Sequence, residues 1–328
     1  MTGLLVGIDV GGTKTHLRAQ STTGRITADL VTPTTGWHAA TWSTRADLLV
    51  DWVGSAVGGA AVAAVAVGAR GCDTEEQARD LGDAFAPRVS VPVVVVNDAQ
   101  LLGPALDRDG SICLIAGTGS IAVGQGPDGR PLFAGGHGWL VGDDGGGTGL
   151  VREAVRGLLQ SQDHGDRDEI LFRYLCAAAG VDDSQDLATA LASRPLAEWS
   201  GWAAALFRAA GDGSPVAGRT VAAGARSLAE LVRALVRRGA ESRSVVMGGG
   251  VVTAQPSYAA LVADRIRGTV GAVEVLVLEE PPVAGAVRLA GQLAGTTAPV
   301  AAGPAPSADS PTAPLRQPSV PSSPKGTS

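Results

Sequence analysis

Two similar glycine turns constrain the fold of this chain more than any other feature of its sequence. An apolar run that ends at Asp9 enters Gly11-Gly12-Thr13 and continues as a second predicted strand, His16–Ser21. Later, the apolar run 111–116 enters Gly117-Thr118-Gly119 and again continues as a strand. A strand, a glycine turn and a strand that recur in this way predict a duplicated domain. Two unrelated hairpins are the alternative.

The first turn has the composition of a phosphate-binding loop. Gly11 and Gly12 leave backbone N–H groups unobstructed, so that these groups can point at phosphate oxygens. Thr13 and Thr15 add hydroxyl donors, and Asp9 stands at a strand end where a carboxylate meets a nucleotide-bound Mg²⁺, usually through water. The pattern is neither the dinucleotide fingerprint nor the Walker loop. An ordinary tight hairpin turn is the alternative interpretation.

Length and composition favour small-molecule chemistry in a chain of two domains. The 328 residues can bury two cores, and 45% hydrophobic with 18% charged residues is typical of a soluble globular protein. A net charge of -6 argues against nucleic-acid or anionic-membrane partners, which need clustered Lys and Arg. The longest apolar stretch, 58–69, is too short to span a bilayer, and no signal peptide is apparent. We therefore expect a cytoplasmic protein.

The first half reads as alternating strands and helices after the glycine turn. We expect a strand near 26–31, a helix near 40–57, a strand at 62–68, a helix at 75–85 and a strand at 91–96. The run Val93–Val96 is typical of a buried parallel strand. This order predicts an α/β lobe.

Beyond Gly145 the apolar spacing becomes helical, and we expect an inserted block of helices in the second lobe. The predicted helices are 150–160, 168–179, 196–210 and 216–238. A strand at 244–247 then ends in Gly248-Gly249-Gly250, before a helix from Pro256, a strand at 273–278 and a helix at 282–293. The glycine run would let adenine or ribose lie against backbone, with a plain tight turn as the alternative.

Five motifs occur in this order along the chain: Asp9-Val10-Gly11-Gly12-Thr13, Asn97-Asp98-Ala99, Gly117-Thr118-Gly119-Ser120, Gly135-Gly136-His137-Gly138 with Gly142-Asp143-Asp144-Gly145, and Met247-Gly248-Gly249-Gly250. Together they resemble the N-acetylglucosamine kinase family, the sugar-kinase branch of the BadF/BadG/BcrA/BcrD-type ATPases in the actin-like, Hsp70-like and hexokinase-like superfamily. The resemblance covers about residues 3–295.

The resemblance implies an α/β fold of two ribonuclease-H-like lobes that close like a hinge on ATP and a sugar. The lobes would be 1–105 and 106–295, the second with a helical segment at about 146–240. The final helix, 282–294, is a candidate to pack back on the first lobe. Residues 296–328 are rich in Ala, Pro, Ser, Thr and Gly, and we expect a disordered tail there.

The same resemblance implies roles for the glycine turns and an activity. The expected phosphate-binding residues are Gly11, Gly12, Thr13 and Lys14 in one lobe and Gly117, Thr118 and Gly119 in the other, with Gly248, Gly249 and Gly250 facing adenosine. ATP and Mg²⁺ are the implied cofactors, and Asp9 is the implied metal residue. The implied reaction is transfer of the γ-phosphate to a hydroxyl of an amino sugar, the 6-hydroxyl of N-acetylglucosamine. Lobe closure would exclude water that could otherwise hydrolyse ATP.

Asp98 is the predicted general base. It follows the buried strand 91–96 at its carboxyl end, where ligands bind in open parallel sheets. A carboxylate there can accept the proton of a sugar hydroxyl and orient its oxygen in line with the γ-phosphorus. The alternative is that Asn97 and Asp98 only cap a helix that begins at Ala99.

The resembling family binds its sugar with the segment around Asp143, so we assign this carboxylate to a sugar hydroxyl. Gly136 and Gly138 would line the N-acetyl side, and Trp37 could cover the face of the sugar ring. Solvated acids in a loop, and an ordinary Trp, are the alternatives. The complete expected sugar-binding set is Trp37, Asn97, Asp98, Thr118, Gly136, His137, Gly138 and Asp143.

The chain departs from the commoner form of the family at several of these positions. That form has Trp in place of His137, Glu in place of Asp144 and Ser in place of Gly146, and it has an Asn near Trp37 that is absent here. His137 could form a hydrogen bond to a sugar substituent that Trp cannot form, or it could only occupy the position of the Trp side chain. The acceptor is therefore open among N-acetylglucosamine, glucosamine, a muramic derivative and a plain hexose.

Three other functions fit the sequence less well. A repressor/kinase glucokinase group shares the Asp-x-Gly-Gly-Thr-Lys loop, but its Cys-rich zinc motif has no match here. An ATPase that drives an electron-transfer partner needs cysteines for a bridging cluster, and Cys113 and Cys176 are not set in such a motif. A sugar-sensing regulator would not need Asp98. The sequence leaves open whether the chain forms a homodimer.

Overall fold

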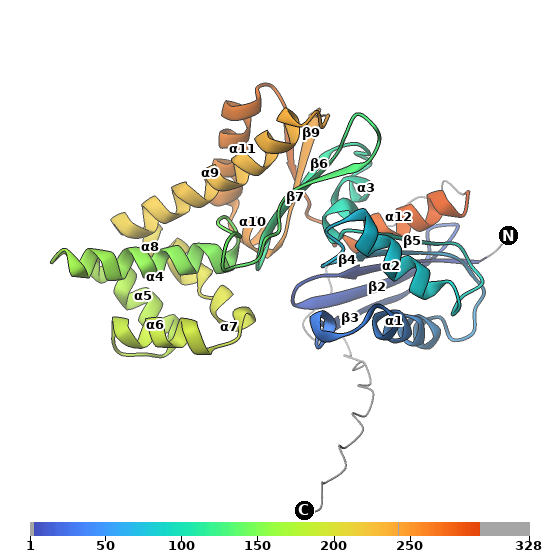
Figure 1. The fold of residues 1–328 in the computed structure, drawn as a ribbon, viewed down its shortest axis with the longest axis horizontal. Helices are drawn as coiled ribbons and strands as arrows, with labels where there is room; N and C mark the ends of the chain where they lie inside the picture. Colours follow the sequence, from blue (N-terminus) through green and yellow to red (C-terminus); the bar gives the residue numbers. More distant parts are fainter. Residues whose placement is uncertain (1–2, 242, 296–328) are drawn as a thin grey trace, which may run out of the picture.

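Two five-stranded sheets, one in each lobe, repeat the same strand order (Figure 1). The computed structural model describes residues 3–241 and 243–295, and the tail predicted at 296–328 lies outside them. The sheets run β3-β2-β1-β4-β5 and β8-β7-β6-β9-β10. In each, three antiparallel strands are followed by two parallel ones. The predicted α/β fold of two ribonuclease-H-like lobes is thereby confirmed.

Alternation along β1 distributes the core of the first lobe over both faces of its sheet. Its elements are β1 (Leu4–Val10), β2 (Lys14–Ser21), β3 (Ile26–Pro33), η1 (Trp37–Ala39), α1 (Trp42–Val57), β4 (Val62–Ala69), α2 (Glu75–Phe85) and β5 (Val93–Val96). Val6, Ile8 and Val10 belong to the core cluster under α1 and α2, whereas Leu5 belongs to a cluster on the other face.

The last helix of the chain, α12 (Val283–Leu293), covers that other face of the first sheet. Its residues Val287 and Ala290 pack with Leu5 of β1 and Ala64 of β4. Gly7 makes the approach feasible, because a Cβ there would lie 2.5 Å from the backbone nitrogen of Val287. The chain therefore returns to its first lobe after completing its second.

The second lobe carries a block of helices between β8 and β9, where the first lobe has only η1 and α1. The first lobe ends with η2 (Asp98–Leu101) and α3 (Leu102–Ala105). The elements of the second lobe are β6 (Ile112–Ala116), β7 (Ser120–Gln125), β8 (Pro131–Gly135), α4 (Gly147–Asp163), α5 (Glu169–Ala179), α6 (Ser184–Ser193), α7 (Leu196–Ser200), α8 (Ala203–Gly211), α9 (Pro215–Arg237), β9 (Ser244–Gly248), α10 (Gly250–Ala254), α11 (Pro256–Val270) and β10 (Glu274–Val277). The predicted helical insertion is confirmed.

Apart from short helices such as α10, the observed elements differ from the predicted ones in three places: strand β8 and helix α6 are unpredicted, and one predicted helix is divided. Strand β8 is absent from the prediction because its apolar run is short, and helix α6 begins at a cap formed when Asp183 accepts a hydrogen bond from the Asp186 N–H at 2.8 Å. The single helix predicted at 196–210 is divided at Gly201 into α7 and α8. Within the described chain, no helix is long and apolar enough to cross a membrane.

A partly buried ionic cluster ties β2 to β3. Asp29 accepts hydrogen bonds from Nε and Nη2 of Arg18 at 3.1 and 3.0 Å, and its Oδ1 lies 2.6 Å from Nε2 of His16. The side chain of Arg18 is fully buried. Burial alone would raise the pKa of Asp29, but the hydrogen bonds from His16 and Arg18 and the charge of Arg18 outweigh it and lower that pKa.

Replacing Asp29 with Asn should lower the free energy of unfolding by about 2 kcal/mol, because the buried guanidinium of Arg18 loses its counter-charge. Since the folded-state pKa of Asp29 is lowered, its contribution is complete above about pH 4 and is lost as the pH falls further. Urea unfolding of both proteins at pH 7 and pH 3 measures the effect, which should shrink at pH 3. Asp47→Asn, at an exposed carboxylate paired with Arg88, should have a much smaller effect, and equal losses would contradict the interpretation.

Candidate active site

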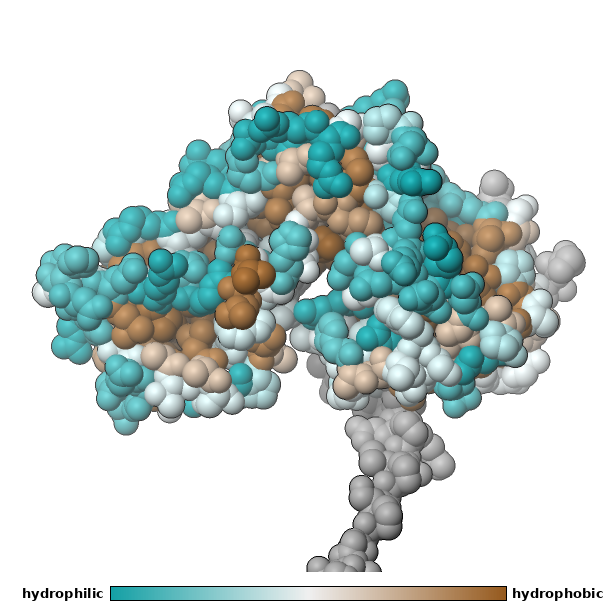
Figure 2. Space-filling view, in the orientation of Figure 1, coloured by the Kyte–Doolittle hydropathy of each residue, from teal (hydrophilic) through white to brown (hydrophobic). Residues whose placement is uncertain are grey.

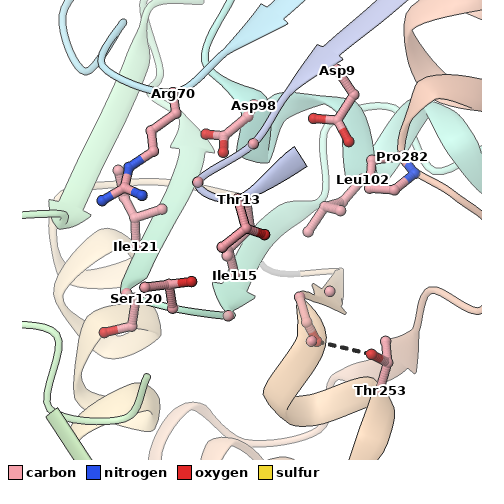
Figure 3. A pocket seen from close by; sticks show the side chains of 18 of the residues that line it. Asp9, Thr13, Arg70, Asp98, Leu102, Ile115, Ser120, Ile121, Thr253 and Pro282 are labelled. Carbon is pink, nitrogen blue, oxygen red and sulfur yellow. Dashed lines mark hydrogen bonds between the residues drawn. The ribbon is translucent and has the colours of Figure 1, made fainter. Parts of the chain in front are cut away.

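A cavity of about 640 Å³ lies between the two lobes. Figure 2 shows the surface hollowed between them, and Figure 3 shows side chains that line the cavity. Both glycine turns and the third glycine run face it. The sequence-predicted residues in its lining are Asp9, Gly11, Gly12, Thr13, Lys14, Asp98, Gly117, Thr118, Gly119, Gly136, Gly138, Asp143, Gly248, Gly249 and Gly250. Residues spread over most of the chain thus meet in one space.

Close backbone contacts shape the glycine turns. The N–H of Gly11 donates to the carbonyl of Lys14 at 3.0 Å, and that of Gly117 donates to the carbonyl of Gly119 at 3.0 Å. Gly249 has a φ of 101°, and a Cβ there would lie 2.7 Å from the carbonyl of Ala116. Glycine is required for such a conformation and approach. The third glycine run therefore packs directly against the start of the second turn.

Asp98 stands at the start of η2, just beyond β5. Asn97 caps this helix by accepting a hydrogen bond from the Ala99 N–H at 3.0 Å, and Asp98 Oδ1 accepts from the same group at 3.1 Å. Asn97 is therefore the main cap of η2, whereas the Asp98 carboxylate lines the cavity. Burial raises the pKa of Asp98 to about 7, although the positive charge of Arg70 opposes the rise. A carboxyl group with a pKa near 7 is suited to general base catalysis.

Asp9 is a buried carboxylate at the end of β1, 8% exposed. Burial, and next the charge of Asp98, raise its pKa to about 8, while Lys14 opposes the rise. A bound cation would compensate this cost of burial. Mg²⁺ is usually held by one or two carboxylates together with phosphate oxygens and water. The position of Asp9, which forms no ion pair with any residue that the structure describes, therefore fits a nucleotide-bound Mg²⁺ beside it.

The glycine-rich segment after β8 holds Asp143 in a strained backbone conformation. Asp143 has a φ of 62°, and its Oδ1 accepts a hydrogen bond from the Ser120 N–H at 2.9 Å. A Cβ on Gly149 would lie 2.1 Å from the Asp143 carbonyl oxygen, so the segment packs tightly on α4. Arg152 of α4 fixes the segment further by donating to the Gly142 carbonyl at 3.0 Å. This strained conformation directs the Asp143 carboxylate toward the second glycine turn.

Three residues of the expected sugar-binding set lie outside the cavity lining. Trp37 is 5% exposed, and its indole N–H donates to the Arg70 carbonyl at 2.9 Å, so it belongs to the core of the first lobe. Asn97 is buried, with its amide donating to Asp73 Oδ1 at 2.9 Å. His137 is exposed beside the cavity. The sugar contacts expected of these three residues therefore have no support in the geometry.

The sequence reasoning missed several charged residues of the lining. Arg70 and Asp73 follow β4, the strand between β1 and β5, and Glu279 and Glu280 follow β10. The rule that singled out Asp98, that ligands bind beyond the carboxyl ends of parallel strands, applies equally to these positions. Applying it to every parallel strand would have found them.

Comparisons with known proteins agree with this geometry. Residues 6–290 match the model of the BadF/BadG/BcrA/BcrD ATPase family. An N-acetylmuramic acid/N-acetylglucosamine kinase of Clostridium acetobutylicum is 27% identical over 166 residues, which are 48% of this chain and 54% of the relative. The match thus spans about half the length of that curated relative.

Solved structures share the two-lobed fold. A candidate N-acetylglucosamine kinase from Chromobacterium violaceum superposes with a TM-score of 0.69 at 20% identity, over 88% of this chain and 99% of that one. A second one, from Porphyromonas gingivalis, has a TM-score of 0.66 at 20% identity, over 88% of this chain and 98% of that one. At such identities the similarity is evidence for the fold alone.

Proposed function

Because the chain belongs to the BadF/BadG/BcrA/BcrD ATPase family, we propose that it is an ATP-dependent kinase of an amino sugar. The observation that carries the proposal is the position of Asp98, a carboxyl group with a pKa raised to about 7 in one cavity with both glycine turns. The acceptor we propose is N-acetylglucosamine, a sugar that the curated relative and both solved structures have in their names. The proposed site of transfer is the 6-hydroxyl, the primary hydroxyl of such a sugar.

The proposed mechanism assigns one task to each part of the cavity. Backbone N–H groups at Gly12, Thr13, Thr118 and Gly119 bind the phosphates of ATP, while those of Gly11 and Gly117 close the turns. The carboxylate of Asp98 accepts the proton of the sugar hydroxyl as its oxygen bonds to the γ-phosphorus and the bond from that phosphorus to ADP breaks. Asp9 would hold Mg²⁺, usually through water, and the ion would neutralise phosphate charge.

Asp143 completes the proposed acceptor site. Only its Oδ1 accepts a hydrogen bond within the described part of the chain, so Oδ2 is available to a sugar hydroxyl. Gly136 and Gly138 also line this part of the cavity, and their φ angles of 73° and 83° lie in the region that favours glycine. Backbone amides without side chains suit the close approach of an N-acetyl group. This arrangement supports the amino-sugar assignment.

A coupled assay of ADP release tests the proposed function directly. The purified protein, ATP and Mg²⁺ are combined with N-acetylglucosamine, N-acetylmuramic acid, glucosamine or glucose, or with no sugar. We expect ADP release to depend on the sugar and to be fastest with N-acetylglucosamine. Release at the same rate without sugar would identify an ATPase instead, and no release with any sugar would contradict the kinase assignment.

A further inference from the structure

Arg70 projects a guanidinium group into the cavity from a rigid position. It directly follows β4, and its backbone N–H donates to the Val10 carbonyl at 2.9 Å. Its carbonyl accepts the hydrogen bond from the indole of Trp37. Both backbone polar groups are therefore held by the core of the first lobe. Figure 3 shows the side chain extending beside Asp98.

The guanidinium group of Arg70 has no bonded partner among the described residues, although its charge opposes the rise in the pKa of Asp98 and of Asp73. Across residues 3–241 and 243–295, no carboxylate lies within 4.0 Å of it and no acceptor takes a hydrogen bond from it. A guanidinium carries five N–H donors in a planar fork and stays charged at all physiological pH values. An unused group of this kind in a cavity is suited to an incoming oxyanion.

Arg70 also lies directly against the first glycine turn. A Cβ built on Gly12 would be only 2.3 Å from Nη1 of Arg70, so the guanidinium fills the space in which a side chain would lie. On its other side is Asp98, whose pKa the charge of Arg70 lowers against the effect of burial. The guanidinium therefore lies between the phosphate turn and the proposed base. A phosphoryl group that passes from nucleotide to sugar must cross this region.

We propose that Arg70 binds the γ-phosphate of ATP and stabilises the charge on the transferred phosphoryl group. This inference rests on the proposed function for its kinetic part, but not for its binding part. During transfer, negative charge spreads over three equatorial oxygens of the phosphoryl group. The planar guanidinium group can donate two parallel hydrogen bonds to such oxygens, whereas the ammonium group of a lysine cannot.

A carboxylate on an acidic amino sugar is the other oxyanion that could meet Arg70. The contact with Gly12 favours the phosphate, because this glycine belongs to the nucleotide side of the cavity. The two ligands lead to different kinetic results. A phosphate contact affects every acceptor, whereas a carboxylate contact affects only acidic acceptors.

Nucleotide binding by isothermal titration calorimetry tests the inference without any sugar. In the presence of Mg²⁺, Arg70→Ala should weaken binding of a non-hydrolysable ATP analogue by about tenfold or more and leave ADP binding within about threefold. Arg79→Ala removes the same charge from an exposed site on α2, outside the cavity lining, and should change neither affinity. Equal weakening of the analogue and of ADP, or no weakening of either, would overturn the proposal. Thermal denaturation checks that each variant is folded.

Turnover with a neutral and an acidic amino sugar, N-acetylglucosamine and N-acetylmuramic acid, provides the kinetic test. Arg70→Ala should lower kcat by about 10²- to 10³-fold with every sugar that the wild type phosphorylates, and Arg70→Lys should recover part of the loss. A loss confined to the acidic sugar would overturn the phosphate contact. If the wild type phosphorylates no sugar, the proposed function fails, while the binding comparison still decides the role of Arg70.

Discussion

Replacing Asp98 with Asn is expected to lower kcat by at least about 10²-fold, because the amide cannot accept the proton of the acceptor hydroxyl. The carboxyl group lies in the cavity with both glycine turns, at the start of η2. The coupled ADP assay at saturating ATP and N-acetylglucosamine measures the effect. Asp51→Asn, on the exposed face of α1 in the same lobe, should retain full turnover. Full activity of Asp98→Asn would contradict the base assignment.

The Asp98→Asn variant should remain folded, so that a fall in kcat reports the loss of the proton acceptor and not unfolding. The amide oxygen can still accept the hydrogen bond from the Ala99 N–H, and the main cap of η2 is Asn97. Burial disfavours the charged form of Asp98, so a neutral side chain there should leave Tm unchanged or slightly higher. A large fall in Tm would instead indicate a structural role for the carboxylate.

Replacing Gly285 with Ala is expected to impair both stability and turnover. A Cβ there would lie 2.0 Å from the Leu101 carbonyl oxygen and 3.0 Å from the Ala105 nitrogen, which are backbone atoms of η2 and α3. Helix α12 must therefore move away from this segment, at a cost of about 3 kcal/mol in the free energy of unfolding. Because Asp98 begins η2, the same displacement should lower kcat by about 10²-fold.

Urea unfolding and the coupled assay measure the two consequences of Gly285→Ala. Gly268→Ala provides the matched control, because this glycine is also helical, lies exposed on α11 and has open space where the Cβ would be. The control should be neutral or gain about 0.5 to 1 kcal/mol of stability. Similar unfolding free energies for the two variants would show that α12 tolerates a larger separation from η2.

The sequence was sufficient for those features that depend on local pattern. Glycine turns between apolar strands, the continuous run Val93–Val96 and the amphipathic helices each have a signature within a few residues. The repetition of the first turn at Gly117-Thr118-Gly119 predicted the duplicated sheets, and the family resemblance implied that the two turns share one cleft. Strand β8 and helix α6 were missed because their apolar patterns are too short to stand out.

Features that depend on distant contacts could not be predicted. Trp37 looked like a sugar platform from its neighbours in sequence, but its indole is held by the carbonyl of Arg70, 33 residues away. Asn97 looked like a ligand-binding residue, but it joins the cap of η2 to Asp73. The place of Arg70 beyond β4 could have been predicted, but the lack of a partner for its guanidinium group among the described residues depends on how the neighbouring strands and turns fold.

The position of α12 has a consequence for how this protein is made. The face of the first sheet that carries Leu5 and Ala64 is covered mainly by α12, near the end of the described chain, together with Leu101 of η2. A ribosome releases the chain from its N-terminus, and in most multidomain proteins the first domain folds while the next is being synthesised. Here the first lobe cannot complete its core until α12 has left the ribosome. The lobe that carries Asp9 and Asp98 is therefore synthesised first but completes its folding last. A chain truncated before residue 283 should lack a stable first lobe.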